Sequence, residues 1–299
     1  MADELFVTRS SELATRNSVI VVQNLWYSYN DEVTALRGID LEIEDGDYVA
    51  VIGQNGSGKT TLVKHFNGLL KPTRGRVLVK GLGDREGSPL LRNTGGLTVG
   101  QLAQTVGYVF QNPDHQIFCA TIREELAFGP RNLGLSEAEV RGRVEEALAR
   151  FDLEPYADWP PAMLGYGLRR KIGVAAVYSM RPRIFILDEP TTGLDWRSTM
   201  ELMELIKEMH RHGHTIIVVT HDMKLVAGFS QKSLVLRDGQ VLVYDDTRNV
   251  FKRSEVLRDT QIEPPQITAL AKRMVPYGMP DDVLSVGEFY AAYCKRMEN

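Results

Sequence analysis

The sequence predicts an α/β fold with a parallel-sheet core, an N-terminal antiparallel β subdomain, an inserted helical subdomain and a small C-terminal extension. Apolar runs at 48–53 (YVAVIG), 183–189 (RIFILDE) and 215–222 (TIIVVTHD) are typical of strands buried on both faces. An amphipathic helical segment at 198–213 separates the last two runs. This order indicates a strand–helix–strand unit with a right-handed crossover, and hence parallel strands.

The first hundred residues predict the antiparallel subdomain. Residues 1–17 have no regular pattern, and we expect a flexible tail there. Residues 18–29 and 35–47 alternate apolar and polar side chains, which predicts strands with one solvent-facing side. A further strand is expected at 76–81, and an insertion at about 82–104 is expected to form a polar, glycine-rich surface loop.

Beyond the tail, the chain is expected to divide into a core, a helical subdomain and a C-terminal extension. The core should comprise residues 18–111 and 179–246, and the helical subdomain should occupy residues 112–178 between them. Within that subdomain, Ser136 is a helix start signal, because apolar residues spaced three and four apart follow it. Residues 247–299 are then left to form the C-terminal extension.

Composition limits the functions that need to be considered. The 299 residues are 43% hydrophobic and 25% charged, as in ordinary soluble proteins, and the net charge of −4 predicts no nucleic-acid partner. The two cysteines, Cys119 and Cys294, lack metal-ligand spacing and suit a reducing compartment. No signal peptide or apolar spanning segment is apparent, so we expect a cytoplasmic chain whose membrane role, if any, comes through a partner.

The strongest chemical signal is GQNGSGKT at 53–60, directly after a buried strand. Such a loop predicts a P-loop NTPase core, because small residues let backbone N–H groups turn inward around phosphates. Lys59 is expected to reach the β and γ oxygens of ATP, and Thr60 to offer its hydroxyl to Mg²⁺. The residues expected to bind the nucleotide here are Gly53, Asn55, Gly56, Ser57, Gly58, Lys59, Thr60 and Thr61.

Two carboxylates at the end of the strand at 183–189 provide candidates for hydrolysis. Asp188 can hold Mg²⁺ through water, and Glu189 can polarise the attacking water. His221 ends the next buried strand, where it could contact the γ-phosphate. Taken alone, the carboxylates could be a strand ending in solvent and the histidine could be structural, but the upstream phosphate loop favours catalysis.

Together these motifs resemble the nucleotide-binding subunit of an ABC transporter over almost the whole chain. The resemblance implies a RecA-like core that hydrolyses Mg·ATP, with Glu189, His221, Lys59 and Gln111 as catalytic residues. It also implies that Tyr29 stacks on adenine, with Tyr27 as the less favoured alternative. Gln111 matches the glutamine that touches Mg²⁺ and links the site to a membrane partner. Asp195 matches the loop that crosses to a second ATPase subunit.

The stretch LGYGL at 164–168 stands where the family carries the signature L-S-G-G-Q, which closes over ATP bound to the opposite subunit. Leu164 and Gly167 match that pattern, whereas Gly165, Tyr166 and Leu168 replace serine, glycine and glutamine. The serine hydroxyl is lost, and a bulky ring stands where the backbone should approach phosphate closely. We therefore hypothesise a heterodimer in which a second, non-identical ATPase supplies an intact signature.

The stretches at 111–116 (QNPDHQ) and 121–129 (TIREELAFG) resemble the ATPases of energy-coupling factor importers. The resemblance implies a subunit at the cytoplasmic face of the membrane. It would drive uptake of a vitamin or metal ion through a transmembrane scaffold and a substrate-binding membrane subunit. Residues 249–274 resemble the family's C-terminal extension, which is linked to pairing of the two ATPases.

Three alternatives stay open at this point. The chain could serve another ABC importer, or act as a soluble ABC protein of translation or DNA repair. It could also be a nucleotide-dependent regulator with low turnover. Translation-type relatives usually carry two ATPase domains and repair-type relatives a long coiled-coil insertion, so one compact domain disfavours the second alternative. The altered stretch at 164–168 keeps the third one open.

Overall fold

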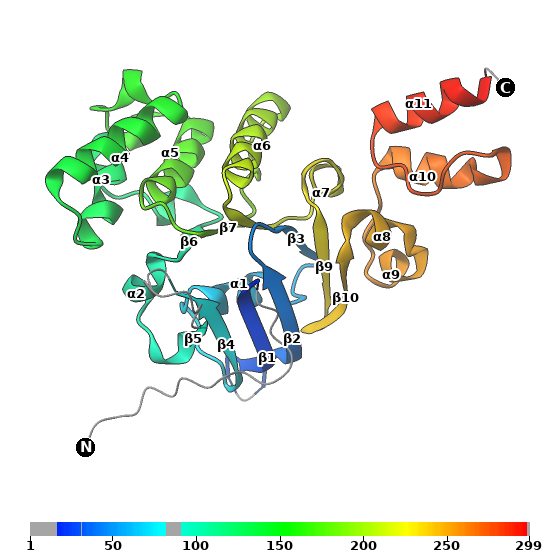
Figure 1. Cartoon of the computed structure of the whole chain (residues 1–299), viewed down its shortest axis with the longest axis horizontal. Helices are drawn as coiled ribbons and strands as arrows, with labels where there is room; N and C mark the ends of the chain where they lie inside the picture. The colour runs from blue at the N-terminus through cyan, green and yellow to red at the C-terminus, as the bar shows by residue number, and fades with distance from the viewer. Residues whose placement is uncertain (1–16, 31, 82–90, 298–299) are drawn as a thin grey trace.

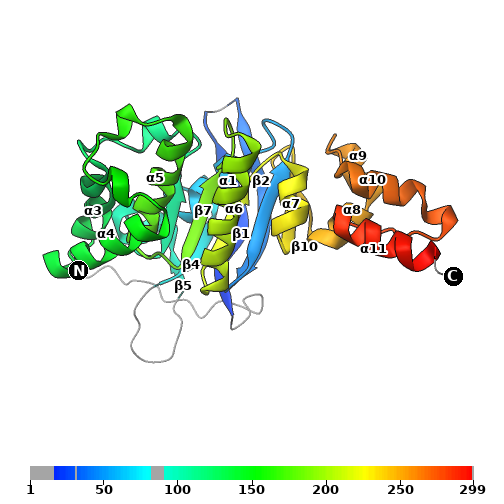
Figure 2. The same ribbon diagram turned by 90° about the horizontal axis from the view of Figure 1, so that it is seen from above.

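The computed structural model describes residues 17–30, 32–81 and 91–297. The expected N-terminal tail, apart from residue 17, and residues 82–90 of the insertion lie outside the described residues. Two sheets form the centre of the molecule, with the helical subdomain at one side and the C-terminal extension at the other (Figures 1 and 2).

The larger sheet has six strands in the order β10-β9-β3-β8-β7-β6. Strands β9, β3, β8, β7 and β6 run parallel and β10 pairs antiparallel with β9, so the predicted parallel core is confirmed. Every residue of β3, β7 and β8 is buried, as the apolar runs predict. The strands are β3 (Tyr48–Gly53), β6 (Val106–Val109), β7 (Ile184–Asp188), β8 (Thr215–Val219), β9 (Lys232–Arg237) and β10 (Gln240–Asp246).

The smaller sheet is antiparallel among the described residues, in the order β2-β1-β4-β5. Strand β2 (Thr34–Glu44) alternates as predicted, but β1 (Ser18–Ser28) begins with five consecutive buried residues. The prediction of one solvent-facing side is therefore wrong for the first half of β1. Both faces of the sheet are covered here, because Val21 faces the side opposite to Ile20 and Val22 and is buried together with its register partner Leu78 of the neighbouring strand β4 (Arg74–Lys80).

The predicted surface loop in the insertion is wrong in part. Residues Leu91–Asn93 form β5 beside β4, and Val99–Ala103 form the short helix α2. Thr98 accepts a hydrogen bond from the backbone N–H of Gln101 at 3.3 Å, and the Gln101 side chain accepts one from the N–H of Thr98 at 2.9 Å. This capping box was present in the sequence, but the surrounding glycines concealed it.

The helices cover the six-stranded sheet on both faces. Helix α1 (Lys59–Phe66) is packed between the two sheets, and α6 (Trp196–Arg211) shares a core with the opposite face and the helical subdomain. Helix α4 begins after Ser136, as predicted. The remaining helices are α3 (Ile122–Asn132), α4 (Glu137–Arg150), α5 (Tyr166–Ser179), α7 (Met223–Phe229), α8 (Thr247–Lys252), α9 (Ser254–Asp259), α10 (Gln266–Arg273) and α11 (Val286–Met297).

Candidate active site

The loop between β3 and α1 depends on glycine for its shape. Gly53 and Gly58 have φ angles of +150° and +100°, in the region that side chains disfavour. A Cβ on Gly58 would lie 2.9 Å from the carbonyl oxygen of Ala35, and a Cβ on Gly53 would collide with the carbonyl of Leu236. The backbone therefore folds tightly against its neighbours, and α1 starts immediately afterwards with its positive N-terminal end toward the loop.

Two polar side chains of this loop are buried in a way that fits a phosphate ligand. The amine Nζ of Lys59 donates hydrogen bonds of 2.9 Å to the carbonyls of Gly53 and Gln54. Burial lowers the pKa of Lys59, and the nearby carboxylates of Glu189 and Asp188 partly oppose that shift. The buried hydroxyl of Ser57 has no hydrogen-bond partner among the described residues. Because buried polar groups are normally paired, this hydroxyl points to a ligand.

The buried carboxylate of Asp188 lies where a metal ion would meet these phosphates. Its Oδ1 accepts a hydrogen bond from the hydroxyl of Thr60 at 3.1 Å, and its Oδ2 accepts one from the hydroxyl of Tyr108 at 2.8 Å. Strand pairing brings Tyr108 to this place, because β6 lies beside β7 with Tyr108 opposite Ile186. Hydroxyl and carboxylate oxygens suit Mg²⁺, which typically takes its other ligands from water and nucleotide phosphates.

The described residues hold no cluster of three or more His, Cys, Asp or Glu side chains that could bind a metal ion unaided. A cation at Thr60 and Asp188 would therefore depend on the nucleotide for several of its ligands. Gln111, the third expected oxygen donor, is exposed on the wall of the same cavity. These residues fit Mg²⁺ bound together with ATP.

Replacing Tyr108 with phenylalanine is expected to raise the Mg²⁺ concentration needed for half-maximal ATP turnover by about tenfold, because the second hydrogen bond that orients Asp188 is lost. A Mg²⁺ titration of phosphate release at saturating ATP would measure the change. Tyr178→Phe is the matched control, since its hydroxyl also donates to a carboxylate, at 2.9 Å to Glu146 in the helical subdomain. An unchanged Mg²⁺ requirement in Tyr108→Phe would contradict this role.

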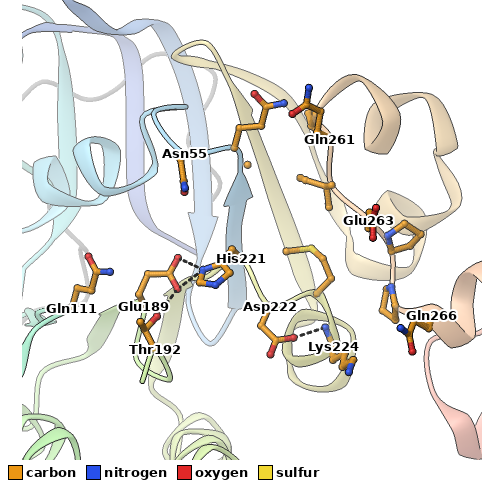
Figure 3. Close-up of a pocket in the computed structure, with 17 residues that line it drawn as sticks. Asn55, Gln111, Glu189, Thr192, His221, Asp222, Lys224, Gln261, Glu263 and Gln266 are labelled. Atoms are coloured by element: carbon orange, nitrogen blue, oxygen red, sulfur yellow. Dashed lines mark hydrogen bonds and ion pairs between the residues drawn. The ribbon is translucent and has the colours of Figure 1, made fainter. Parts of the chain in front are cut away.

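Glu189 and His221 form a pair at the same edge of the sheet. The His221 Nδ1 atom lies 2.9 Å from the Glu189 carboxylate, which also accepts a hydrogen bond from the hydroxyl of Thr192 at 3.3 Å (Figure 3). The Glu189 side chain is 13% exposed, whereas that of His221 is 69% exposed. Glu189 also has a φ angle of +48°, a left-handed conformation that is uncommon for residues other than glycine. This arrangement fixes the carboxylate and leaves the imidazole open to a ligand.

Two adjoining hollows bring most of the expected residues together. The first, of about 520 Å³, is large enough for a nucleotide. The second, a groove of about 1010 Å³, separates this edge of the sheet from residues 260–266 of the C-terminal extension (Figure 3). The expected residues that line the first hollow are Tyr29, Asn55, Gly56, Gly58, Lys59, Thr60, Thr61, Gln111 and Glu189. Those that line the groove are Gly53, Asn55, Gln111, Glu189 and His221.

Tyr29, and not Tyr27, is the aromatic ring at the mouth of the first hollow. This residue is 55% exposed, and its hydroxyl lies 2.9 Å from the hydroxyl of Thr61. The ring of Tyr27 packs edge-on behind it, with the ring centroids 4.9 Å apart. This geometry favours Tyr29 as the residue that stacks on the base, which stays a prediction.

The altered signature lies apart from both hollows. The N-cap of helix α5 is Gly165, which has no hydroxyl where the family pattern has serine. No side chain therefore caps this helix. The ring of Tyr166, which we expect to stand where phosphate should approach, packs against Gly193 of its own chain. A Cβ on Gly193 would lie 3.0 Å from the Tyr166 ring. The ring therefore packs within its own chain, and its obstruction of a phosphate across the subunit interface stays a prediction, whereas the loss of the hydroxyl follows from the identity of Gly165.

Asp195 has a local structural role in addition to its predicted cross-subunit role. It is the N-cap of α6, where its carboxylate accepts a hydrogen bond of 2.7 Å from the backbone N–H of Ser198. That hydrogen bond lowers the pKa of Asp195. Asp195 is exposed, which leaves it accessible to a second subunit. Its contact with that subunit stays a prediction.

Two residues of the stretch at 111–116 have contacts that the sequence alone did not predict. Gln116 accepts a hydrogen bond from the N–H of Phe110 at 3.1 Å and donates one to the carbonyl of Gly173 at 2.7 Å. Asp114 forms an ion pair with Arg169. These side chains tie residues 111–116 to α5. Their spacing was visible as a motif, but the partner helix could not be deduced from the spacing.

Comparison with known proteins gives a consistent result. The family model described as "ABC transporter" matches residues 36–192. An energy-coupling factor transporter ATP-binding protein, EcfA, of Methanococcus maripaludis is 38% identical over 253 residues, which cover 85% of this chain and 88% of that protein. An ABC transporter ATP-binding protein of Caldanaerobacter subterraneus is 46% identical over 256 residues, which are 86% of this chain but only 43% of that protein.

Two solved structures have the same fold. The structure of cbiO1 from Clostridium perfringens, described as part of the ABC transporter complex cbiONQ, superposes with a TM-score of 0.70 at 36% identity and covers 85% of this chain and 98% of that one. The ATP-binding cassette MJ0796, a dimer bound to ADP and phosphate, gives a TM-score of 0.65 at 28% identity, with 76% and 98% covered. No helix within the described part of the chain is long and apolar enough to cross a membrane.

Proposed function

This chain belongs to the ABC transporter family as an ATP-binding and ATP-hydrolysing subunit, and we propose that it powers an energy-coupling factor importer for a vitamin or metal ion. The observation that carries the proposal is that Lys59, Thr60 and Glu189 line one nucleotide-sized hollow, where Asp188 accepts a hydrogen bond from Thr60 and His221 pairs with Glu189 from the adjoining groove. The similarity to EcfA over most of both chains favours this importer class over other ABC importers and over a low-turnover regulator.

In this proposal, each part of the site has its own chemical task. The glycine-rich loop and Lys59 hold the triphosphate, and Tyr29 stacks on the adenine. Thr60, Asp188 and Gln111 would hold Mg²⁺, which neutralises charge on the β and γ phosphates. Glu189, fixed by His221 and Thr192, orients the attacking water. The exposed edge of His221 contacts the γ-phosphate and senses its loss.

We propose that a second, non-identical ATPase completes the site. Residues 164–168 lack the signature serine and line neither hollow, so this chain's own signature does not enclose its own ATP. The C-terminal extension offers a pairing surface, because α11 exposes four large side chains spaced four, three and four residues apart, as on one helical face. These residues are Val286, Tyr290, Tyr293 and Met297.

A second exposed surface fits the transmembrane scaffold. Phe118 and Phe128 are 65% and 46% exposed, and their ring centroids lie 4.7 Å apart. The buried carboxylate of Glu125 holds this place by accepting hydrogen bonds from the N–H groups of Phe118 at 3.0 Å and Cys119 at 2.8 Å. An exposed aromatic pair beside residues 111–116 supports docking of a membrane subunit there, with this chain at the cytoplasmic face.

Purification of the tagged chain from its native membranes is expected to retain one further ATPase subunit and at least one integral membrane protein. The double variant Phe118→Ser, Phe128→Ser should lose the membrane protein and keep the second ATPase. Leu242→Ser is the matched control, since Leu242 is 43% exposed on β10 at the opposite edge of the sheet. Retention of the membrane protein by the double variant would contradict the docking site. Cooperative ATP hydrolysis by the chain alone, unchanged by the second subunit, would contradict the pairing.

A further inference from the structure

Arg170 of helix α5 occupies an unusual place for a cation. It is 1% exposed, and its guanidinium group reaches two segments outside its own helix, at Phe110 and at residues 189–192. Nη1 donates a hydrogen bond to the carbonyl of Phe110 at 2.8 Å, and Nη2 lies 3.2 Å and 3.5 Å from the carbonyls of Glu189 and Thr192. Burying a charge is costly unless hydrogen bonds compensate, and all of these acceptors are main-chain oxygens.

Tyr166 of the altered signature completes this arrangement. Its hydroxyl accepts a hydrogen bond from Arg170 Nη2 at 3.2 Å, and its ring lies 5.5 Å from the Arg170 guanidinium carbon. The same ring packs against Gly193, whose φ angle of +82° lets the chain turn closely past it. The ring thus holds both the guanidinium and the turn at 193–195.

Residues 189–192, which Arg170 contacts, include a backbone conformation that neighbouring groups must hold in place. Glu189 has a left-handed backbone, and its N–H donates to the carbonyl of Val219 at 2.9 Å while its own carbonyl faces Arg170. A strained conformation persists only where the surroundings determine it from several sides. Arg170 supplies one of those contacts from the signature helix.

We propose that Arg170 is a positioning residue for Glu189, and that Tyr166 orients Arg170 for this task. The altered signature therefore has a function within its own subunit, where it connects α5 to the catalytic carboxylate and to residues 193–195. Asp114 and Gln116 also connect residues 111–116 to α5. In this proposal, a shift of residues 111–116 moves α5, and Arg170 on that helix transmits the movement to Glu189. This inference rests on the ATP-hydrolysing function of the chain.

Arg170→Lys tests the proposal, because lysine keeps the charge but lacks the planar fork that reaches several acceptors at once. We expect the kcat for ATP to fall by about tenfold to a hundredfold, with the KM and the ATP affinity unchanged. Tyr166→Phe keeps the ring and removes only the hydroxyl, so its kcat should fall by a smaller factor, and it covers the case in which Arg170→Lys does not fold. Arg143→Lys is the matched control, since Arg143 also donates to a main-chain carbonyl, that of Met180 at 2.9 Å.

Two further readouts separate positioning from a general structural role. Amide hydrogen exchange in residues 189–194 should accelerate in Arg170→Lys and Tyr166→Phe, while the melting temperature and the exchange of β3 stay as in the wild type. In a Glu189→Gln background, Arg170→Lys should reduce turnover no further, because Arg170 acts on catalysis only by positioning the Glu189 carboxylate, which that background already lacks.

The proposal is overturned if both variants match the wild type in kcat and in hydrogen exchange. It is also overturned if, in both variants, the fall in kcat is accompanied by a loss of ATP affinity or a lower melting temperature, because the effect is then general and not specific to Glu189. A wild-type chain that neither binds nor hydrolyses ATP would instead refute the proposed function. In that case the hydrogen-exchange comparison would still decide whether Arg170 and Tyr166 hold residues 189–194.

Discussion

Glu189→Gln should lower the rate of ATP hydrolysis by about 10²- to 10⁴-fold, the usual contribution of a positioned general base. The amide keeps the shape of the side chain but cannot accept the proton of the attacking water. Its two polar atoms can still meet His221 and Thr192, which lie 2.9 Å and 3.3 Å from the carboxylate. We therefore expect the fold and the ATP affinity to be retained.

Phosphate release and a fluorescent-nucleotide titration, made on the same preparation, would measure both quantities. Glu145→Gln is a suitable control, because this carboxylate pairs with Arg123 on the surface of the helical subdomain. Turnover that survives in Glu189→Gln at the wild-type rate would contradict the assigned role. It would also favour a nucleotide-dependent regulator over an ATPase that powers transport.

Lys59→Ala should weaken ATP binding by at least about a hundredfold, because truncating one partner of a buried charge pair typically costs this much or more. The amine already lies inside the loop, where it bonds the carbonyls of Gly53 and Gln54, so the side chain needs little reorganisation to meet a phosphate. Removing it takes away the positive charge and one hydrogen-bond donor to each of these carbonyls, of which that of Gln54 still accepts from the N–H of Ser57 at 3.1 Å.

An equilibrium titration with ATP, combined with a thermal melt, would separate lost binding from lost folding. Lys64→Ala is the matched control, since Lys64 is in the last turn of the same helix and does not line the hollow. The account expects Lys59→Ala to remain folded and the control to bind ATP normally. Equal ATP affinity in Lys59→Ala and the wild type would contradict it.

Much of the site followed from the sequence because parallel strands place their carboxyl ends at one edge. Asp188 ends β7, Glu189 follows it directly and His221 comes shortly after β8, so the order of the buried strands was enough to predict that they lie close together. The role of Tyr108 could not be predicted in the same way. It depends on β6 lying next to β7, although the helical subdomain separates these strands along the chain.

The signature shows a different limit of sequence reasoning. The loss of the serine hydroxyl at Gly165 could be predicted, because it needs only the identity of one residue. The direction of the Tyr166 ring could not, since it depends on Arg170 one turn later and on the left-handed turn at Gly193. The hairpin of β9 and β10 was predictable but missed: Asp238 and Gly239 are the turn dipeptide that favours it.

Calorimetric titration of the purified chain with ATP tests the central claim most directly, namely that the loop around Lys59 binds a triphosphate together with Mg²⁺. The account predicts saturable uptake of ATP that is tightened by Mg²⁺ and weakened by at least about a hundredfold in Lys59→Ala. Failure of the wild-type chain to take up ATP, with or without Mg²⁺, would contradict the account.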